Sequence, residues 1–455
     1  LTITDGAQIA MTGDAVIDAG AVVVEENGTL TNTGSTTVGS LAATNANDIQ
    51  LGSLTSAGNV TLTGTNMTAA LASAQNLSVT GGNLDATSSD TTAVEENLTL
   101  SDGTHAFGDL TVTENAGLTN SVLTADSLTV GGTTDISGGS VTADGSMILT
   151  DKLTAQNTTI NAATLTVKSD AELTNTALLG SVSVDGALSM TEGSFEGSLV
   201  KAGATTIDSV NDFVSTGASN LASLDADDST LVFGELTVEG LADITNGSLA
   251  ADKLTAGQIA ATDTTIDIAG AVSVTGDSVL TGTDFDAESF TSEASLTVSG
   301  GTFDAALVKA GDVIANNGAQ ITSTGASSIA SLDADGATLT FGDVTVTGKA
   351  DVTDGSFAAD SLSAGLLAGT DTTIDIEGAV SVAGGSTLTN TDFDAATFTS
   401  DSTLTVTGGT FDAALVKAGD VTATNGAQLT STGASTIASL TNNASTVTFG
   451  DLTVN

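Results

Sequence analysis

The sequence predicts an all-β fold, a single-stranded parallel β-solenoid, from three observations: a long internal repeat, the absence of proline, and strand-like alternation of apolar and small polar residues. The repeat is clearest in the phrase GGTFDAALVKAGDV at 300–313, which returns unchanged at 408–421 and in looser form at 192–205. Lys201, Lys309 and Lys417 hold the same place in the three phrases, so the same 108-residue step separates each from the next. Because no insertion disturbs this step, we interpret the repeat as several smaller turns copied as one block.

The absence of proline is the second observation. The chain has 455 residues and no Pro, whereas average usage is about 5%. Proline lacks the N–H group that a strand ladder needs, so it is confined to sheet edges, strand starts and bulges. A solenoid offers few such places, because each turn is hydrogen-bonded to the turns above and below it.

The third observation is a period of two in short segments such as NVTLTG (59–64), AVSVTG (271–276), DVTVTG (343–348) and STLTVTG (402–408). This alternation is typical of half-buried strands, and each segment ends in turn-forming residues. The 108-residue block then holds six coils of 18 residues or five of 21–22, so we expect roughly 18–22 residues per coil. The handedness of parallel crossovers favours a right-handed β-helix.

The expected organisation is one continuous solenoid over residues 1–455. The repeat is clear from about residue 198, with copies at 198–305 and 306–413 and a partial copy at 414–455, and residues 1–197 form more divergent coils. The segments at both ends of the sequence, LTITDG and DLTVN, have the pattern of strands. We therefore expect the stacking to continue beyond them, into more polypeptide or into a neighbouring subunit.

The phenylalanines provide a test of this phase assignment. Phe is the only aromatic residue type, with 13 copies. Residues one repeat apart in a solenoid have nearly the same neighbours. Two trios are therefore expected to occupy equivalent core environments: Phe195, Phe303 and Phe411, and Phe233, Phe341 and Phe449.

The charge excludes some partners. Seven Lys oppose 55 Asp and Glu, for a net charge of −48, which disfavours nucleic acid and direct insertion into an anionic membrane. The cluster DADD at 225–228 suggests a calcium site, because Ca²⁺ is bound by carboxylate oxygens. Its equivalents read DADG at 333–336 and TNNA at 441–444. Since these ligands are not kept, no metal site is assigned, and calcium is left as an alternative cofactor.

The sequence offers little for catalysis. His105 is the only histidine and lies in SDGTHAFG, where we expect an exposed turn residue; Cys, Trp, Tyr and Arg are absent. The repeated lysines of LVKAG are interpreted as surface residues in salt bridges. We therefore predict no enzyme and assign no catalytic, cofactor-binding or metal-binding residue.

Several segments rich in Gly, Thr, Ser, Asn and Asp carry a family resemblance, among them GSLTS, NVTLTG, SLTVGG and TLTVTGGTFDA. Together with the absence of Cys, this text resembles the repetitive passenger regions of Gram-negative autotransporters and filamentous-haemagglutinin-like adhesins. The resemblance covers essentially the whole chain. It implies a right-handed parallel β-helix, display at the bacterial cell surface, and an adhesive, spacer or fibre role. The implied partners are a host or neighbouring-cell surface, or further copies of the chain.

Three alternatives remain beside this extracellular adhesive rod. The chain could be a subunit of an extracellular filament or surface layer that assembles end to end. An ice-binding solenoid is less favoured, because the T-x-T patterns at 61–65, 111–113, 387–391 and 403–407 share no obvious register. A polysaccharide-active enzyme is less favoured because the aromatic and basic residues that such enzymes use are missing.

Overall fold

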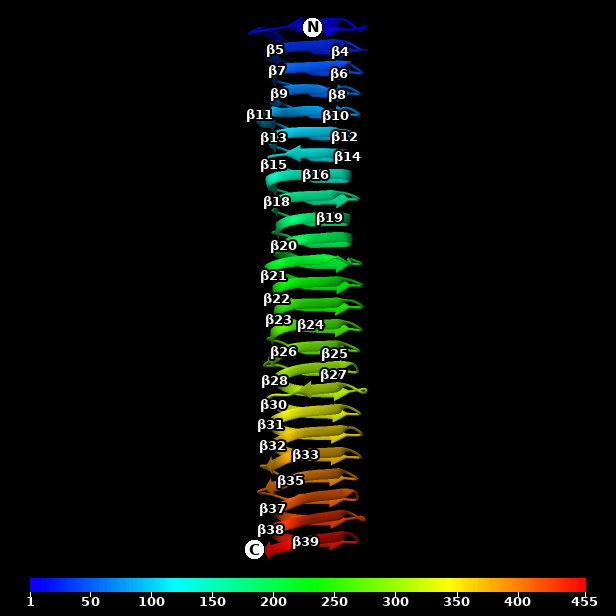
Figure 1. The fold of residues 1–455 in the computed structure, drawn as a ribbon, viewed down its shortest axis with the longest axis vertical. Coiled ribbons are helices and arrows are strands. Elements are labelled where there is room, and N and C mark those ends of the chain that lie inside the picture. Colours follow the sequence, from blue (N-terminus) through cyan, green and yellow to red (C-terminus); the bar gives the residue numbers. More distant parts are fainter. The chain divides into compact units, whose positions relative to one another are not determined.

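A computed structural model describes residues 1–455 and confirms the fold class: the chain is all-β, with no helix, and its parallel strands stack as a β-solenoid. The solenoid has about 25 turns of about 18 residues each, the lower end of the predicted range. The chain divides into two compact units, residues 1–222 with 228–232, and residues 223–227 with 233–455. Within each unit, successive strands lie one above another (Figure 1).

The first twenty strands have the following bounds: β1 (Thr2–Ile3), β2 (Gln8–Met11), β3 (Val16–Ala19), β4 (Val22–Glu25), β5 (Thr29–Val38), β6 (Leu41–Thr44), β7 (Asp48–Ser56), β8 (Val60–Thr63), β9 (Met67–Ala74), β10 (Leu77–Thr80), β11 (Leu84–Val94), β12 (Leu98–Ser101), β13 (Thr104–Val112), β14 (Ala116–Ala125), β15 (Ser127–Val130), β16 (Thr134–Leu149), β17 (Leu153–Gln156), β18 (Thr159–Val167), β19 (Ala171–Val184) and β20 (Leu188–Asp208).

The remaining strands have these bounds: β21 (Phe213–Asp227), β22 (Thr230–Thr245), β23 (Ser248–Thr262), β24 (Thr265–Val274), β25 (Ser278–Thr281), β26 (Asp284–Ser292), β27 (Leu296–Ser299), β28 (Thr302–Asn316), β29 (Gln320–Ser323), β30 (Ser327–Asp335), β31 (Thr338–Thr353), β32 (Ser356–Thr370), β33 (Thr373–Val382), β34 (Ser386–Thr389), β35 (Asp392–Ser400), β36 (Leu404–Thr407), β37 (Thr410–Thr424), β38 (Gln428–Asn443) and β39 (Thr446–Val454).

Each turn contains three short strand segments, which we name face A, face B and face C in chain order. In the turn that begins at Leu41, β6 is face A, residues 48–51 of β7 are face B, and residues 53–56 of β7 are face C. Each face pairs in parallel with the same face of the next turn, as Leu41 pairs with Val60. The strands β4, β6, β8 and β10 thus form one stack and β5, β7, β9 and β11 another (Figure 1).

The core is produced by the alternation seen in the sequence. In β8, Val60 and Leu62 are buried while Thr61 and Thr63 are exposed. Burying one such aliphatic side chain contributes about 1.5–3 kcal/mol. The narrow interior is filled in this way by Leu, Val, Ile, Ala and Phe, and the buried set contains no Asp, Glu or Lys.

The corner between face A and face B has one recurring requirement: every turn places a residue there with positive φ. Asn45, Asp102 and Gly336 are examples, with φ of 48°, 54° and 65°. Gly adopts this left-handed conformation at no steric cost, and Asn and Asp tolerate it better than other residues. The Gly, Asn and Asp that follow the strands in the sequence therefore mark the beginning of each corner.

The corner between faces B and C brings successive turns close together. A Cβ atom at Gly52 would lie 2.3 Å from the carbonyl oxygen of Thr33 in the preceding turn. No side chain fits at that distance, so this position needs glycine for space. The close approach keeps the two turns in contact through the bend.

Side chains also join successive turns at the corner between faces C and A. Asn76 donates to Asn59, Asn97 to Asn76, and Asn115 to Asn97, with Nδ2–Oδ1 distances of 3.1, 3.3 and 3.1 Å. The Oδ1 atom of Asn115 in turn accepts from the backbone N–H of Thr133 at 3.0 Å. Such asparagine ladders stabilise stacked parallel strands.

The register shows how many turns the 108-residue repeat contains. One inward position of face B pairs in turn through Phe303, Ile321, Leu339, Phe357, Ile374, Phe393 and Phe411. These are six steps. The block therefore holds six turns of about 18 residues each, and the option of five longer turns is excluded.

The first phenylalanine trio behaves as predicted: Phe195, Phe303 and Phe411 are all buried. Equivalent rings also make equivalent contacts. Phe285 stacks on Phe303 with centroids 4.7 Å apart, and one repeat later Phe393 stacks on Phe411 at 4.6 Å.

The second trio is only partly equivalent. Phe233 and Phe341 are buried, whereas Phe449 is half-buried. Phe449 lies in β39, the last strand of the chain, which pairs with β38 alone. The expectation for Phe449 was wrong: within residues 1–455 its turn has repeat neighbours on one side, so its ring is covered less than the rings of Phe233 and Phe341.

Candidate functional site

The outward side of face A carries a regular array of threonine side chains in the second unit. Thr353 pairs with Thr370, Thr370 with Thr389, Thr389 with Thr407, and Thr407 with Thr424. A second row lies two residues earlier on β34, β36 and β37 and continues onto β38; it consists of Thr387, Thr405, Thr422 and Thr441. We name these nine residues, in their two rows, the threonine ladder.

The geometry of the threonine ladder follows from the strands. Within a row, neighbouring positions are one strand spacing apart, about 4.8 Å, and the two rows are separated by two residues, about 6.6 Å. Inward-facing residues such as Leu388 and Val406 lie between them and are buried. The hydroxyl of Thr424 donates to that of Thr407 at 3.2 Å. The ladder thus forms a two-dimensional array of hydroxyl and methyl groups.

The expectation that T-x-T patterns share no register was wrong in this part of the chain. The patterns at 387–389 and 405–407 stack directly on each other, and the pattern at 422–424, which sequence reasoning missed, continues them. The threonines of the longer row lie at positions 353, 370, 389, 407 and 424, so the steps between them in sequence are unequal. The steps differ because the corners between faces differ in length. The turns could have been aligned from the sequence by placing the Gly, Asn or Asp with positive φ after each face A at the same position.

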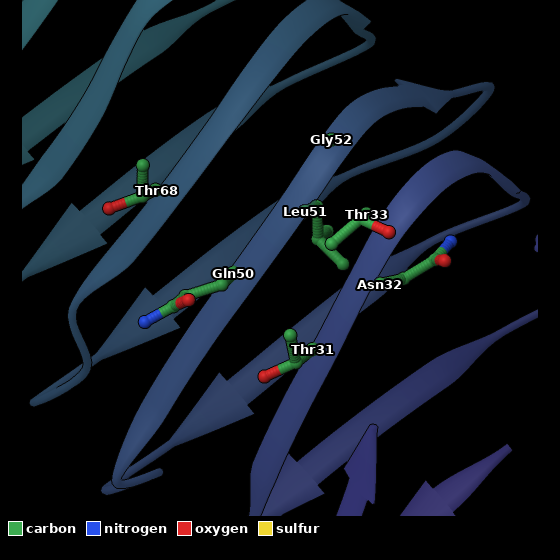
Figure 2. Close-up of a pocket in the computed structure, with 7 residues that line it drawn as sticks. All are labelled: Thr31, Asn32, Thr33, Gln50, Leu51, Gly52 and Thr68. Atoms are coloured by element: carbon green, nitrogen blue, oxygen red, sulfur yellow. The ribbon is translucent and has the colours of Figure 1, made fainter. Parts of the chain in front are cut away.

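A shallow groove of about 430 Å³ lies over β5, β7 and β9 (Figure 2). Three outward side chains, Thr31, Gln50 and Thr68, lie in one register across its floor. The Nε2 atom of Gln50 donates to Asp48 at 2.6 Å, which fixes the amide. Asn32 is buried beside the groove, and its amide is satisfied by Ser35 and Thr36. The residues that line the groove carry no charge.

Acidic residues stack in rows on face B of the second unit. Asp267 pairs with Asp286 and Asp286 with Asp304, and the same row returns one repeat later as Asp375, Asp394 and Asp412. These six carboxylates are exposed and form no hydrogen bond or ion pair. Like charges placed directly opposite on neighbouring strands repel each other.

Other aspartates are hydrogen-bonded by a hydroxyl of the next turn. Thr302 donates to Asp284 at 2.8 Å and Ser295 donates to Asp277 at 2.8 Å. The bonds from the Ser295 side chain and backbone lower the pKa of Asp277. At Asp243, burial and then the charge of Asp225 raise the carboxyl pKa.

The DADD cluster does not assemble a set of three or more ligands, and no such set of His, Cys, Asp and Glu occurs in residues 1–455. Asp225 and Asp227 are exposed on β21, and the amide of Asn246 donates to Asp227 at 3.4 Å. Asp228 occupies the corner after face A with φ of 50°. Gly336 and Ala444 hold the equivalent position at 65° and 56°. The residue type at this position therefore changes between repeat copies, whereas its left-handed backbone conformation does not.

The lysines lie at the surface, as expected, but only some form ion pairs. Lys201 and Lys168 both contact Asp185, and the bond from Lys201 is the main cause that lowers the pKa of this carboxyl. Lys309 and Lys417 form no ion pair, so the predicted salt bridge holds for one copy of LVKAG alone.

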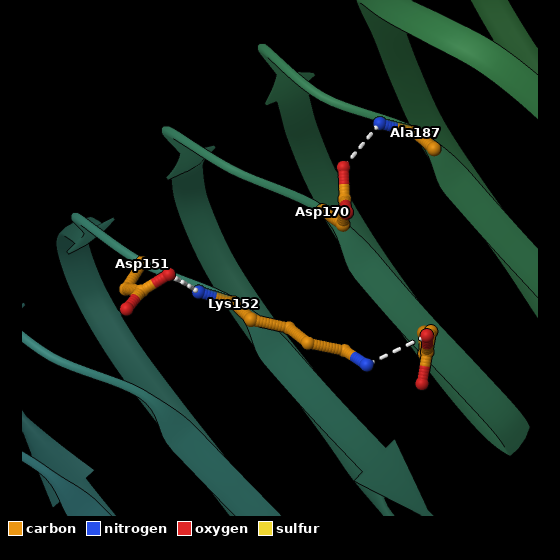
Figure 3. A network of polar contacts seen from close by, with 5 residues as sticks. Asp151, Lys152, Asp170 and Ala187 are labelled. Atoms are coloured by element: carbon orange, nitrogen blue, oxygen red, sulfur yellow. Dashed lines mark hydrogen bonds and ion pairs between the residues drawn. The ribbon is translucent and has the colours of Figure 1, made fainter.

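Charged side chains also connect turns around Lys152 (Figure 3). Its Nζ atom lies 2.6 Å from Oε1 of Glu172 in the following turn. Nearby, Oδ1 of Asp170 accepts from the backbone N–H of Ala187 at 2.8 Å. These contacts bridge neighbouring turns.

The expectation for His105 was wrong. The residue lies near the start of β13, is 0% exposed, and neither ring nitrogen has a hydrogen-bond partner. It pairs with Leu84 of the preceding turn and Leu123 of the following turn, so it takes a core position of face B. Burial lowers the pKa of His105 to about 4. The Gly103 that precedes it supplied the turn signal, but the alternation of buried positions places the imidazole inside.

These features define the chain as a β-solenoid repeat protein whose outward faces carry periodic arrays of small side chains. The sequence matches no protein-family model, no curated protein and no solved structure in the comparisons. None of the structure's secondary-structure elements is a helix that could span a membrane.

Proposed function

We propose that the chain is a structural and adhesive region of an extracellular, surface-displayed protein. The observation that carries this proposal is the return of the same outward side chains every six turns: the exposed row Asp267, Asp286 and Asp304 comes back as Asp375, Asp394 and Asp412. A surface that repeats offers the same contact several times, and multivalent contact raises avidity without new chemistry. The partner is a host or neighbouring-cell surface, or another copy of the chain.

The surface chemistry supports a binding role over a catalytic one. The single histidine is inside the core, the described groove over β5, β7 and β9 holds only neutral polar and apolar residues, and the acidic rows lack a basic partner. We propose that the protein is not an enzyme and acts at the bacterial cell surface by contact alone.

Bead attachment tests this function. Beads coated with residues 1–455 are applied to immobilised bacterial and animal cells at physiological salt, and bead–bead clustering is scored in parallel. Beads coated with an acidic globular protein of similar net charge are the control. We expect specific attachment to cells or specific clustering of coated beads. Attachment no better than that of the control, together with no clustering, would overturn the proposal. Clustering without attachment would favour the filament or surface-layer alternative.

The threonine ladder favours a second candidate, binding to ice. A regular array of hydroxyl and methyl groups on a strand-defined lattice is suited to another regular lattice, and no charged residue interrupts the rows between Thr370 and Thr424. The neighbouring residue that breaks the shorter row is Ala368.

Ice recrystallisation measures this second candidate directly. Thr405→Tyr places a bulky ring in the middle of the ladder, and Thr345→Tyr places the same ring on an outward position of face C. If the ladder binds ice, the chain slows recrystallisation, Thr405→Tyr abolishes the effect and Thr345→Tyr keeps it. Recrystallisation at the rate of buffer alone rules the candidate out.

A further inference from the structure

The core of the first unit contains one titratable side chain, the imidazole of His105. Its position in face B is occupied by Leu84 in the turn before and by Leu123 in the turn after. The imidazole is fully buried, and both Nδ1 and Nε2 lack a partner. A buried polar group without a partner costs free energy, and a buried charge costs much more.

No other titratable group can compensate a charge on this ring. The buried residues of the chain include no Asp, Glu or Lys. On the strands that pack against it, Asp85 and Asp90 of β11 and Asp109 of β13 are exposed, and β12 and β14 contain no charged residue. The charge of an imidazolium would therefore be unpaired in the core.

The strand ladder is also weak beside His105. Residues 87–90 of β11 are left out of the pairing with β13, where the register shifts between Ala86 and Thr91. Between β11 and β9 the pairing is interrupted from Asp85 to Ala93. Fewer backbone hydrogen bonds oppose a local opening here than in an uninterrupted ladder, and local openings of this kind are common in proteins.

We propose that His105 makes the turns of β11, β13 and β14 an acid-sensitive segment, which opens in mild acid while the other turns of the unit stay stacked. Stacked repeats interact with their nearest neighbours, so one segment can open alone. This inference concerns regulation by pH and does not depend on the proposed adhesive role.

The direction of the effect follows from linkage. An open segment exposes the imidazole, whose ordinary pKa is about 6.5, whereas the folded pKa is about 4. Between these values the open state binds a proton and the closed state does not, so closure is favoured above pH 6.5 and is progressively lost as the pH falls to 4. At pH 5 the opening equilibrium is expected to be about 30-fold more favourable than at pH 7.5.

The other turns of the first unit bury no titratable group. Mild acid should therefore loosen the His105 segment and leave those turns closed. This difference separates the proposed device from general acid denaturation.

Hydrogen exchange with mass spectrometry, corrected for the intrinsic effect of pH, tests the proposal on the whole chain. Peptides from residues 104–125 are compared at pH 7.5 and pH 5 in the wild type, in His105→Gln, which stays polar but does not titrate, and in His105→Leu. We expect exchange in the wild-type segment to accelerate by about 30-fold between pH 7.5 and pH 5, with no such acceleration in either variant or in the turns of β6 and β8. An equal pH response in the wild type and His105→Gln would overturn the proposal, as would opening of all turns together.

Discussion

Buried hydroxyl groups fall into two kinds in this core, and the difference lies in their partners. Ser323 and Ser327 share a hydrogen bond of 2.7 Å, and Ser431 and Ser435 repeat it one block later. The second serine of each pair also accepts from a backbone N–H, as Ser435 does from Val416 at 3.1 Å. By contrast, Ser278 and its repeat equivalent Ser386 are buried without any partner.

This contrast gives a prediction with an internal control. Ser386→Ala removes a hydroxyl that makes no hydrogen bond, so we expect the free energy of unfolding to rise by up to about 1 kcal/mol. Ser435→Ala leaves the Val416 N–H unsatisfied in the core and should lower it by about 1–3 kcal/mol. Urea denaturation of the two variants beside the wild type measures both changes. A loss of stability in Ser386→Ala equal to that in Ser435→Ala would contradict this assignment.

Residue identity alone predicted part of this core. The equivalent burial of Phe303 and Phe411 was predictable because the two residues lie in identical sequence segments one repeat apart. The burial of His105 was not, because a polar residue beside Gly103 looks like a turn and the inward alternation is visible only once the strand boundary is known. The buried serine pairs were not predicted for the same reason: Ser and Thr occupy both outward and inward positions of this chain, so their residue type does not indicate burial.

The strands carry their charges in two settings. In β26, Asp284 accepts a hydrogen bond from Thr302, whereas Asp286 lies between Asp267 and Asp304 in an unpartnered acidic row. The two carboxylates are two residues apart on the same outward side of one strand. They therefore form a matched pair for measuring what the acidic row costs.

We expect Asp286→Asn to stabilise the protein by a few tenths of a kcal/mol at low salt, because it removes a like charge from between two others. Asp284→Asn should not stabilise it, since the variant weakens a charge-assisted hydrogen bond. Thermal or urea denaturation at low ionic strength distinguishes the two. Stabilisation of equal size in both variants would mean that net charge matters and the row does not.

Strand positions were predictable from period-two alternation, but their alignment between turns was not. The corners vary in length, so threonines that stack in the ladder are separated by unequal steps in sequence. The missing rule is the left-handed residue after each face A, which resets the register in every turn. Asn45, Asp102 and Gly336 look unrelated as letters and become equivalent only through their shared backbone conformation.

The chain as a whole is dominated by its charge and its periodicity. A net charge of −48 with seven lysines destabilises the compact state by self-repulsion. The acidic rows on face B concentrate this repulsion between neighbouring turns. Screening by salt should relieve it without any change in structure.

We expect the urea midpoint to rise when NaCl is increased from about 0.01 M to about 0.15 M, which shortens the screening length from about 30 Å to about 8 Å. CaCl₂ at matched ionic strength separates screening from specific binding. Equal midpoints in the two salts fit a screened acidic surface. A much higher midpoint in calcium, reversed by a chelator, would instead support the calcium alternative raised by DADD.

The architecture itself was the most predictable feature. A 108-residue step without insertions, no proline and period-two segments were enough for a parallel β-solenoid. The number of turns in the block needed the observed pairing, because six shorter turns and five longer turns fit the same spacing. The right-handedness expected from crossover geometry stays a prediction.

Cysteine cross-linking tests most directly the claim that residues one turn apart lie side by side on one face. The chain has no cysteine, so introduced pairs report without background. Thr387 and Thr405 are paired neighbours, and strand spacing of about 4.8 Å lies within the Cα separation that a disulfide spans. The double variant Thr387→Cys with Thr405→Cys should form an intramolecular disulfide under mild oxidation, whereas Thr387→Cys with Thr397→Cys, on face C of the same turn, should not. Cross-linking of the second pair, or of neither, would contradict the stacked register.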